Sequence, residues 1–297
     1  MPELPEVTLY VEALQRHVVG RTLERVRLRS PSLLKTYDPP LSAVEGRRVL
    51  GLGRIGKRII WQMEGELWLV FHLMITGRFR WRKPGAAVPR KRGHAAFDFP
   101  HGTLLLTEAS AKKRASLHVV RGAESLETFD RGGVEPLESS LEEFRTALLR
   151  ENRTLKRVLT DPRLVSGIGN AHSDEILLAA RLSPLKRTRG LTEDEIAGLH
   201  RATRDWLEAF TERLRTETGD GFPERITAFH PAMRVHGRYG KPCPVCGTPI
   251  QRIRYGENET DYCPGCQTEG RLLRDRSLSR ILRDDWPRTL DELENIE

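Results

Sequence analysis

The sequence predicts an α+β protein, in which a helix leads into a β-sandwich or barrel and a helical region and a cysteine-rich ribbon follow. Three observations predict this fold class. Short runs of alternating apolar residues fill positions 23–120, and the apolar period changes from two to 3.6 residues near Gly132-Gly133. Four cysteines then stand together near the C-terminus.

The composition favours a basic protein that binds a polyanion. The 297 residues are 38% hydrophobic, enough to form two or three small cores. There are 49 Lys and Arg against 41 Asp and Glu, which gives a formal charge of +8, although many basic proteins bind no particular anion. No apolar run approaches membrane-spanning length and the N-terminus is not a signal peptide, so we expect a cytoplasmic, nucleoid-associated protein.

The first expected element is an amphipathic helix that begins near Glu6 and ends before Gly20, a glycine suited to cap it. It should dock on a sheet and hold Pro2 at its N-terminal end. Its apolar positions recur at helical spacing: Val7, Tyr10, Val11, Leu14 and Val18.

The residues before this helix are candidates for chemistry. If Met1 is removed, Pro2 presents a secondary amine, with the carboxylate of Glu3 beside it and that of Glu6 one turn on. An α-amino group has a pKa of about 7.7–8, so part of it is neutral and can form a Schiff base at cellular pH. A proline amine can form only a charged iminium, which favours elimination. The alternative is a frayed terminus in which Pro5 and Glu6 merely start a helix.

Eight strands separated by turn residues are expected next, and they indicate a sandwich or barrel. They cover Leu23–Leu28, Val49–Leu52, Ile59–Met63, Leu67–Leu73, Phe79–Trp81, Ala95–Phe99, Leu104–Thr107 and Leu117–Val120.

Two basic features lie between these strands. Lys57 stands in the turn Gly53–Arg58, where two glycines could bring the backbone close to a ligand. The loop Lys112-Lys113-Arg114 is typical of sequence-independent phosphate contacts. A solvated turn lysine and a solvated charged face are the alternatives.

A helical region follows a domain boundary at Gly132-Gly133. The turn Gly167-Ile168-Gly169-Asn170 joins two of its helices and could grip a phosphate, with Asn170 as an amide donor, or the glycines could serve geometry alone. Thr192 and Glu195 form a capping-box pattern. The expected helices cover Leu141–Leu149, Leu155 to before Asp161-Pro162, Ala171–Arg181 and Thr192–Thr216.

The cysteines carry the strongest local signal. Two CxxC pairs separated by sixteen residues fit a closed four-thiolate site for one structural Zn²⁺ better than two disulfides: Cys243, Cys246, Cys263 and Cys266. Two ribbon strands, Ile250–Tyr255 and Asp261-Tyr262, should turn at Gly256–Asn258. Leu272 to Leu282 suggest a tail helix that ends at Trp286-Pro287.

Together these features resemble the formamidopyrimidine-DNA glycosylase / endonuclease VIII family of base-excision repair enzymes. The residues that carry the resemblance are Met-Pro-Glu-Leu-Pro-Glu-Val at the N-terminus, Lys57, His72-Leu73 with Thr76-Gly77, Lys156 leading into Gly167–Asn170, and the ribbon closing on Gln267. The resemblance implies a catalytic β-sandwich domain over 1–132, a helix-two-turn-helix domain over 133–235 and a zinc finger over 236–270. Residues 271–297 are an additional tail.

The resemblance also implies a bifunctional DNA glycosylase/AP lyase that acts as a monomer on damaged or abasic DNA. Pro2 would attack C1′ of the damaged nucleotide and Glu3 would act as general acid and base, while Glu6 would position the turn. The expected DNA contacts are Lys57, His72, Lys112, Lys113, Arg114, Lys156 and Asn170.

Three features depart from the family pattern, two at the residues that fill the gap left by a flipped base and one at a phosphate-binding arginine of the finger. Met74-Ile75 stands where the family often has Gly-Met, and Glu108–Arg114 replaces a loop that carries Arg and Phe. Asn258 stands at the usual arginine of the finger. We therefore expect a divergent branch that favours single-stranded or crosslinked DNA. A non-enzymatic protein that binds damaged DNA is the main alternative, and a zinc-ribbon RNA-binding protein is a third.

Overall fold

A computed structural model describes residues 1–255, 258–274 and 287–294. The chain divides into two compact units, one formed by residues 1–131 and 209–228 and the other by residues 132–208 and 229–297. Much of the expected tail helix and the tip of the expected ribbon lie outside the described residues. None of the helices in the described ranges is both long and apolar enough to cross a membrane.

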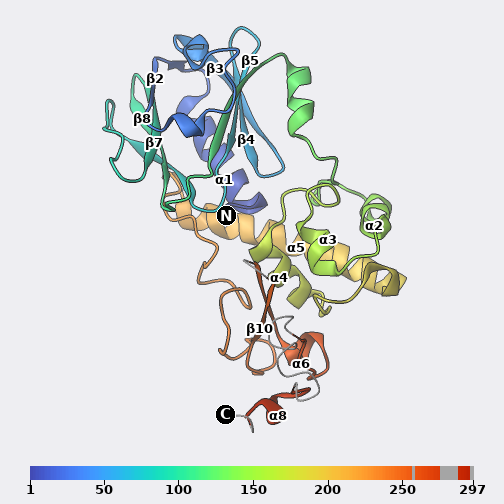
Figure 1. Cartoon of the computed structure of the whole chain (residues 1–297). Helices are drawn as coiled ribbons and strands as arrows, with labels where there is room; N and C mark the ends of the chain where they lie inside the picture. The colour runs from blue at the N-terminus through green and yellow to red at the C-terminus, as the bar shows by residue number, and fades with distance from the viewer. Residues whose placement is uncertain (256–257, 275–286, 295–297) are drawn as a thin grey trace. The chain divides into compact units, whose positions relative to one another are not determined.

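The N-terminal unit is a β-sandwich of two antiparallel sheets (Figure 1). Side chains from both sheets meet in its core, where the rings of Trp61, Phe71, Phe79 and Phe97 are fully buried. The five-stranded sheet has the order β1 (Thr22–Leu23), β3 (Arg47–Ile55), β4 (Arg58–Met63), β5 (Leu67–His72) and β9 (Ser116–Arg121). The four-stranded sheet has the order β2 (Arg25–Leu28), β7 (Gly93–Phe99), β8 (Gly102–Glu108) and β6 (Gly77–Arg82).

One expected strand was wrong in its extent. Leu23–Leu28 is not continuous, because β1 pairs with β3 in one sheet whereas β2 pairs with β7 in the other. The chain changes sheets at Glu24, whose backbone N–H donates to the carbonyl of Asp98. Alternation alone cannot reveal such a crossing, because both halves keep the apolar period of a strand.

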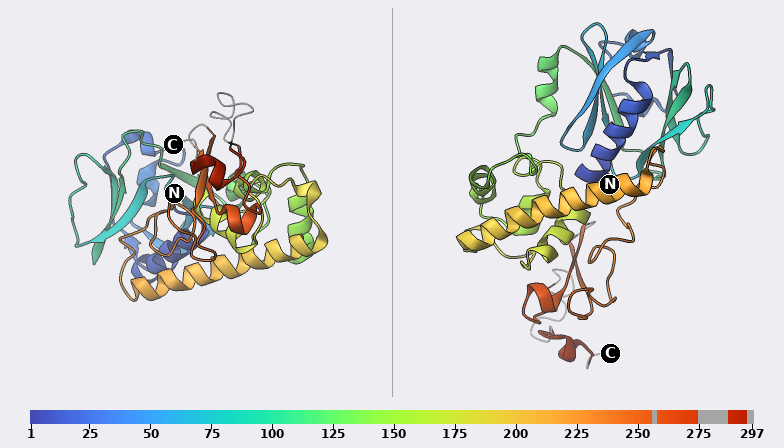
Figure 2. Two further views of the ribbon diagram at one scale, coloured as in Figure 1. Left: turned by 90° about the horizontal axis from the view of Figure 1, so that it is seen from below. Right: turned by 180° about the vertical axis from the view of Figure 1, so that it is seen from behind.

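Helix α1 (Leu4–Val18) packs against β3 and β4, as Figure 2 shows from two further sides. Its Tyr10 ring contacts Phe79 of β6 edge-on, with 5.7 Å between the ring centroids, so α1 also contacts the second sheet. Gly20 follows the helix with φ +76°, a conformation that suits glycine at a helix end. The expected N-terminal helix and its glycine stop are therefore confirmed.

The second unit contains the helices and the zinc ribbon. Thr192 and Glu195 form the expected capping box at the start of α5, since the backbone N–H of each donates to the other's side chain. Residues 193–208 of α5 belong to this unit and residues 209–218 to the first. The elements are α2 (Leu141–Leu149), α3 (Leu155–Thr160), α4 (Asn170–Ala179), α5 (Glu193–Thr218), β10 (Gln251–Tyr255), β11 (Asn258–Tyr262), α6 (Pro264–Gln267) and α8 (Leu290–Glu294). Short 3-10 helices cover Pro31–Leu33, Leu41–Val44, Ala123–Phe129 and Thr188–Gly190.

Candidate active site

Two buried carboxylates stand at the start of α1. Glu3 caps the helix, and its backbone N–H donates to Oε2 of Glu6 at 2.8 Å. Glu3 is only 2% exposed and Glu6 is only 3% exposed. Both lie at the N-terminal end of the helix, where the positive end of the helix dipole favours negative charge. The structure therefore holds Pro2, which is also buried, at a rigid turn.

The electrostatics of this turn favour a neutral amine. Burial lowers the pKa of the Met1 amine below its ordinary 8.0, and the positive charges of Arg78 and Lys57 lower it further, against the opposing effect of Glu3 and Glu6. A lowered pKa increases the fraction of free base, which is the nucleophilic form. While Met1 is attached, the nitrogen of Pro2 is part of a peptide bond, so Pro2 can act only after Met1 is removed.

Lys57 lies between β3 and β4. It follows Gly56, which has a left-handed conformation with φ +56°. Burial lowers the pKa of Lys57, and the charges of Glu3 and Glu6 oppose this shift. The same pair of carboxylates thus acts on both Lys57 and the terminal amine. The structure brings four expected site residues into one electrostatic environment: Pro2, Glu3, Glu6 and Lys57.

His72 ends β5, directly opposite Arg58 of β4. Burial, together with the neighbouring charges of Arg58 and Lys57, lowers the pKa of His72 from 6.5 to about 4. His72 is therefore neutral at physiological pH. Its expected role at DNA is a hydrogen bond from a neutral imidazole and not an ion pair.

Arg78 is a further cation of this site, since its charge acts on the Met1 amine. Its Nε donates to the carbonyl of Ile226 at 2.7 Å, and its Nη1 donates to the carbonyl of Gly77 at 2.6 Å. Because Ile226 lies 148 positions further along the chain, no local pattern could have revealed this contact. Glu224 of the same segment pairs with Arg80 and Arg82.

The turn between β5 and β6 presents an apolar side chain. Met74 has φ +53°, a left-handed conformation that is unfavourable for a side chain larger than glycine, and Ile75 beside it is 52% exposed. The backbone N–H of Gly77 donates to the carbonyl of Leu73 at 2.9 Å. A Cβ at Gly77 would lie 2.1 Å from that oxygen, so the turn requires glycine there.

The basic loop after β8 closes on a buried acid. The Glu108 carboxylate accepts from the backbone N–H groups of Arg114 and Ala115 at 3.1 and 3.2 Å, and its Oε2 lies 2.8 Å from Nε2 of His94. Lys112, Lys113 and Arg114 are exposed. They are thus available for the phosphate contacts that we expect, which stay a prediction.

In the second unit, Asn170 begins α4 directly after the two-glycine turn, and Lys156 lies beneath this turn. The Nζ of Lys156 donates to Asn170 O at 2.7 Å, Ser173 Oγ at 2.8 Å and Asp174 Oδ1 at 2.5 Å. Lys156 is only 8% exposed, and these three acceptors use its three N–H groups. In this structure Lys156 holds the turn, whereas the sequence led us to expect a phosphate contact.

Lys156 belongs to a larger buried network that joins α4 to the zinc ribbon. Oδ2 of Asp174 lies 2.8 Å from Nδ1 of His236 and accepts from the backbone N–H of Asp261 at 3.3 Å. Asp261 accepts in turn from Nε of Arg252 at 2.7 Å. We call Lys156, Asp174, His236, Asp261 and Arg252 the charged network. Two carboxylates and a histidine at this spacing resemble a metal site, but two cations already balance the two carboxylates.

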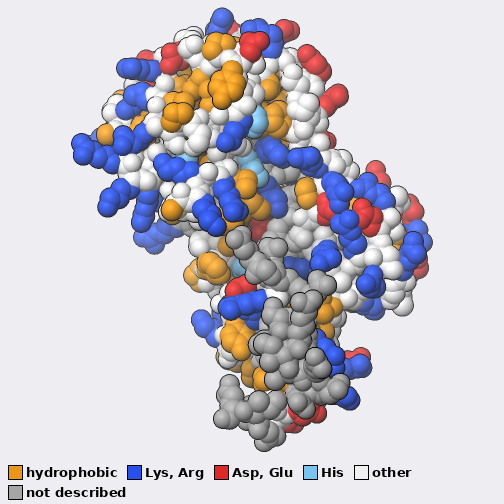
Figure 3. Space-filling view, viewed as in Figure 1, with side chains coloured by type: hydrophobic (Ala, Val, Ile, Leu, Met, Phe, Trp, Pro, Cys, Tyr) orange, Lys and Arg blue, Asp and Glu red, His pale blue; other side chains and the backbone are white. Residues whose placement is uncertain are grey.

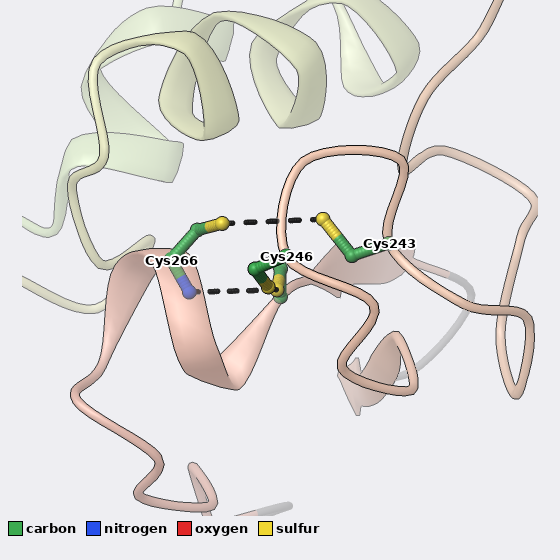
Figure 4. A group of neighbouring side chains, drawn as sticks. Cys243, Cys246 and Cys266 are labelled. Atoms are coloured by element: carbon green, nitrogen blue, oxygen red, sulfur yellow. Dashed lines mark hydrogen bonds between the residues drawn. The ribbon is translucent and has the colours of Figure 1, made fainter.

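The four cysteines converge on a structural zinc site, and Figure 4 shows three of them. Sγ of Cys243 lies 3.9 Å from Sγ of Cys266, and Sγ of Cys246 lies 3.4 Å from that of Cys263. Tetrahedral Zn²⁺ with bonds of about 2.3 Å separates its sulfurs by about 3.8 Å, so these thiols fit the ion. The donor set is closed, so this zinc stabilises the fold and leaves no position for a substrate.

Comparison with known proteins gives consistent matches along the chain. Residues 1–113 match the formamidopyrimidine-DNA glycosylase N-terminal domain, residues 133–219 match the formamidopyrimidine-DNA glycosylase H2TH domain, and residues 240–268 match a zinc finger found in FPG and IleRS.

Relatives and solved structures with the same name cover nearly the whole chain. The formamidopyrimidine-DNA glycosylase of Thermus thermophilus is 36% identical over 281 residues, which are 91% of this chain and 100% of the relative. That of Heliobacterium modesticaldum is 32% identical over 280 residues, 90% of this chain and 100% of the relative. The Lactococcus lactis Fpg in complex with abasic-site DNA has a TM-score of 0.78 at 26% identity and covers 90% of this chain and 99% of its own. The Thermus thermophilus MutM (Fpg) structure has a TM-score of 0.75 at 35% identity, and the match covers 90% of this chain and 98% of that structure's chain.

Proposed function

Because this chain belongs to the formamidopyrimidine-DNA glycosylase family, whose members are DNA glycosylases with AP lyase activity, we propose that it excises damaged bases through a Schiff base on Pro2. The observation that carries the proposal is the buried segment that holds Pro2, Glu3 and Glu6 together. The charges of Glu3 and Glu6 also act on Lys57. After removal of Met1 this turn would combine a free secondary amine, two carboxylates and a cation for a phosphate.

The proposed reaction begins at the free amine of Pro2. Its lone pair forms a bond to C1′ as the glycosidic bond breaks, and the base leaves with the electron pair of the glycosidic bond. The proton of the attached amine passes to the Glu3 carboxylate, which delivers it to the ring oxygen as the C1′–O bond breaks, so the sugar opens to a charged iminium. Loss of a proton from C2′ then breaks the C3′–O bond by β-elimination, and water hydrolyses the adduct and releases Pro2.

The remaining site residues support the DNA in this proposal. Lys57 and Asn170 donate to phosphate oxygens beside the lesion, and neutral His72 adds a hydrogen bond. The damaged base must leave the stack first, which costs a few kcal/mol and favours sites that are already weakened. The solved Lactococcus lactis relative is in complex with abasic-site DNA, whose C1′ aldehyde is a substrate for the lyase half of this chemistry.

A borohydride trapping experiment on abasic DNA tests the chemistry. We expect a covalent adduct that peptide mapping places on Pro2, and we expect Glu3→Gln to reduce trapping at least about tenfold because the general acid is lost. Glu12→Gln on the same helix is the matched control, since Glu12 only pairs with Arg215 and should trap normally. An adduct elsewhere in the chain would refute Pro2 as the nucleophile, and no adduct at all would favour the non-enzymatic alternative.

We further propose that the enzyme prefers lesions in single-stranded or crosslinked DNA. Two features support this: the short loop closed on Glu108 carries no aromatic residue, and Ile75 is the apolar residue exposed at the β5–β6 turn. Such a surface offers little to fill a duplex after a base has left. Excision rates for one lesion in a single strand, a crosslinked duplex and an ordinary duplex test the idea, and faster excision from the ordinary duplex would refute it.

A further inference from the structure

Two exposed aromatic side chains flank one turn of the second unit. Phe229 is 70% exposed and Tyr239 is 56% exposed. The Phe229 ring is stacked on the ring of His236, with 5.7 Å between the centroids and 13° between the planes. A Cβ at Gly237 would lie 2.6 Å from Phe229 Cδ1, so the ring also lies directly over the backbone. Phe229 is therefore held flat and exposed at the same time.

Buried carboxylates fix the turn that supports Phe229. Asp174 contacts the His236 ring through the charged network, and Asp261 accepts from the backbone N–H of Gly237 at 2.7 Å. Glu175, which is fully buried, accepts from three successive backbone N–H groups, those of residues 234 to 236, at 2.8 to 3.0 Å. Burial raises the pKa of Glu175, and these hydrogen bonds oppose that shift. This arrangement gives the exposed rings a rigid base.

One arginine lies over the ring of Tyr239, and a second arginine on the same strand is exposed. The Arg252 guanidinium lies 5.7 Å from the centre of the Tyr239 ring, and the side chain of Arg254 is 64% exposed. Glu259 pairs with both arginines, and Arg234 pairs with Glu175 and lies over the ring of Trp206. Figure 3 shows hydrophobic side chains interleaved with Lys and Arg along one edge of this unit. Exposed aromatic rings among cations are typical of surfaces that bind single-stranded nucleic acid.

We propose that Phe229 and Tyr239 form a stacking platform for unpaired bases of DNA, with the exposed Arg254 of β10 as a phosphate contact. The proposal rests on the single-strand preference proposed above and names the surface that would produce it. Every base has a flat π-face, so such a platform accepts any sequence. A rigid ring also loses little conformational freedom on binding, because the network has already ordered it.

Fluorescence anisotropy with a single-stranded oligonucleotide and the duplex of the same sequence tests the platform. We expect Phe229→Ala and Tyr239→Ala each to weaken single-strand binding about 5- to 150-fold, the effect of losing one stacked base. The salt dependence of binding should not change, because no charge is removed. Tyr37→Ala is the matched control, since Tyr37 is 86% exposed in the other unit and should bind as the unaltered protein does. Zinc content and the unfolding midpoint show that each variant is folded.

The outcomes separate the platform from the proposed function. Folded variants that bind single strands within twofold of the unaltered protein would overturn the platform, even if the enzyme prefers single-stranded lesions. If the unaltered protein excises lesions better from ordinary duplex, the single-strand preference fails. In that case a loss of single-strand affinity in both variants would still support the platform. Tighter binding of RNA than of DNA, lost in the same variants, would overturn the assignment to DNA.

Discussion

Replacing Lys156 by Met tests whether this lysine positions Asn170 or contacts DNA itself. Met keeps most of the length of the side chain but removes its charge and its three hydrogen bonds. The substitution leaves Asp174, whose side chain is fully buried, with only His236 and the N–H of Asp261 as partners.

The expected loss of stability is large for a single substitution. Removing one member of a buried ion pair costs about 3–5 kcal/mol, because the other charge stays buried without its partner. Two donors to Asp174 remain, so we expect the lower end, about 3 kcal/mol, in the free energy of unfolding of the second unit. Arg204→Met is the matched control: Arg204 and Glu208 form an exposed i,i+4 pair in that unit, worth less than about 0.5 kcal/mol.

Denaturant unfolding followed by circular dichroism measures this stability, because helices α2, α3 and α4 belong to the second unit. DNA binding then distinguishes the two roles of Lys156. A positioning lysine already neutralised by Asp174 releases no counterions, so Lys156→Met should weaken binding without changing the slope of log K against log salt concentration.

Two results would refute this reasoning. A loss of stability below about 1 kcal/mol would mean that the buried pair is not what holds the turn. A salt slope reduced by about 0.9 would mean that Lys156 gives up Asp174 and contacts a phosphate in the complex.

Three further predictions follow from the site. Chelating zinc should unfold the ribbon of β10 and β11 and abolish DNA binding, and added Zn²⁺ should restore both, as circular dichroism and anisotropy would show. The pKa of His72 is about 4 in the folded state and about 6.5 in the unfolded state. Its contribution to stability is therefore present above pH 6.5 and is lost as the pH falls towards 4. His72→Gln should make the free energy of unfolding depend less on pH between pH 6.5 and pH 4. Gly77→Ala should lower the melting temperature because its Cβ would clash with Leu73 O. Met74→Gly should raise the free energy of unfolding by about 1 kcal/mol, because glycine adopts the left-handed conformation without strain. A destabilised Met74→Gly variant would contradict this explanation of the turn.

The sequence alone determined most of the elements and the zinc ligands, because their signals are local. Helix α2 was expected over Leu141–Leu149 and has those bounds, since the apolar period and the flanking residues define it within one short stretch. The Thr192 and Glu195 cap depends on residues three positions apart, and each CxxC pair brings two thiols together within one turn of chain.

Only the tertiary structure decided which polar groups are already occupied. Lys156 looked available for a phosphate, yet its three acceptors come from α4, and the ring of His236 is fixed by an acid 62 positions away. Arg78, whose charge acts on the Met1 amine, donates to the distant carbonyl of Ile226, and the Phe229 ring is supported by the ring of His236. Hydrogen-bond partners are chosen by proximity in space after burial has removed water as the competitor, so sequence spacing carries no information about them.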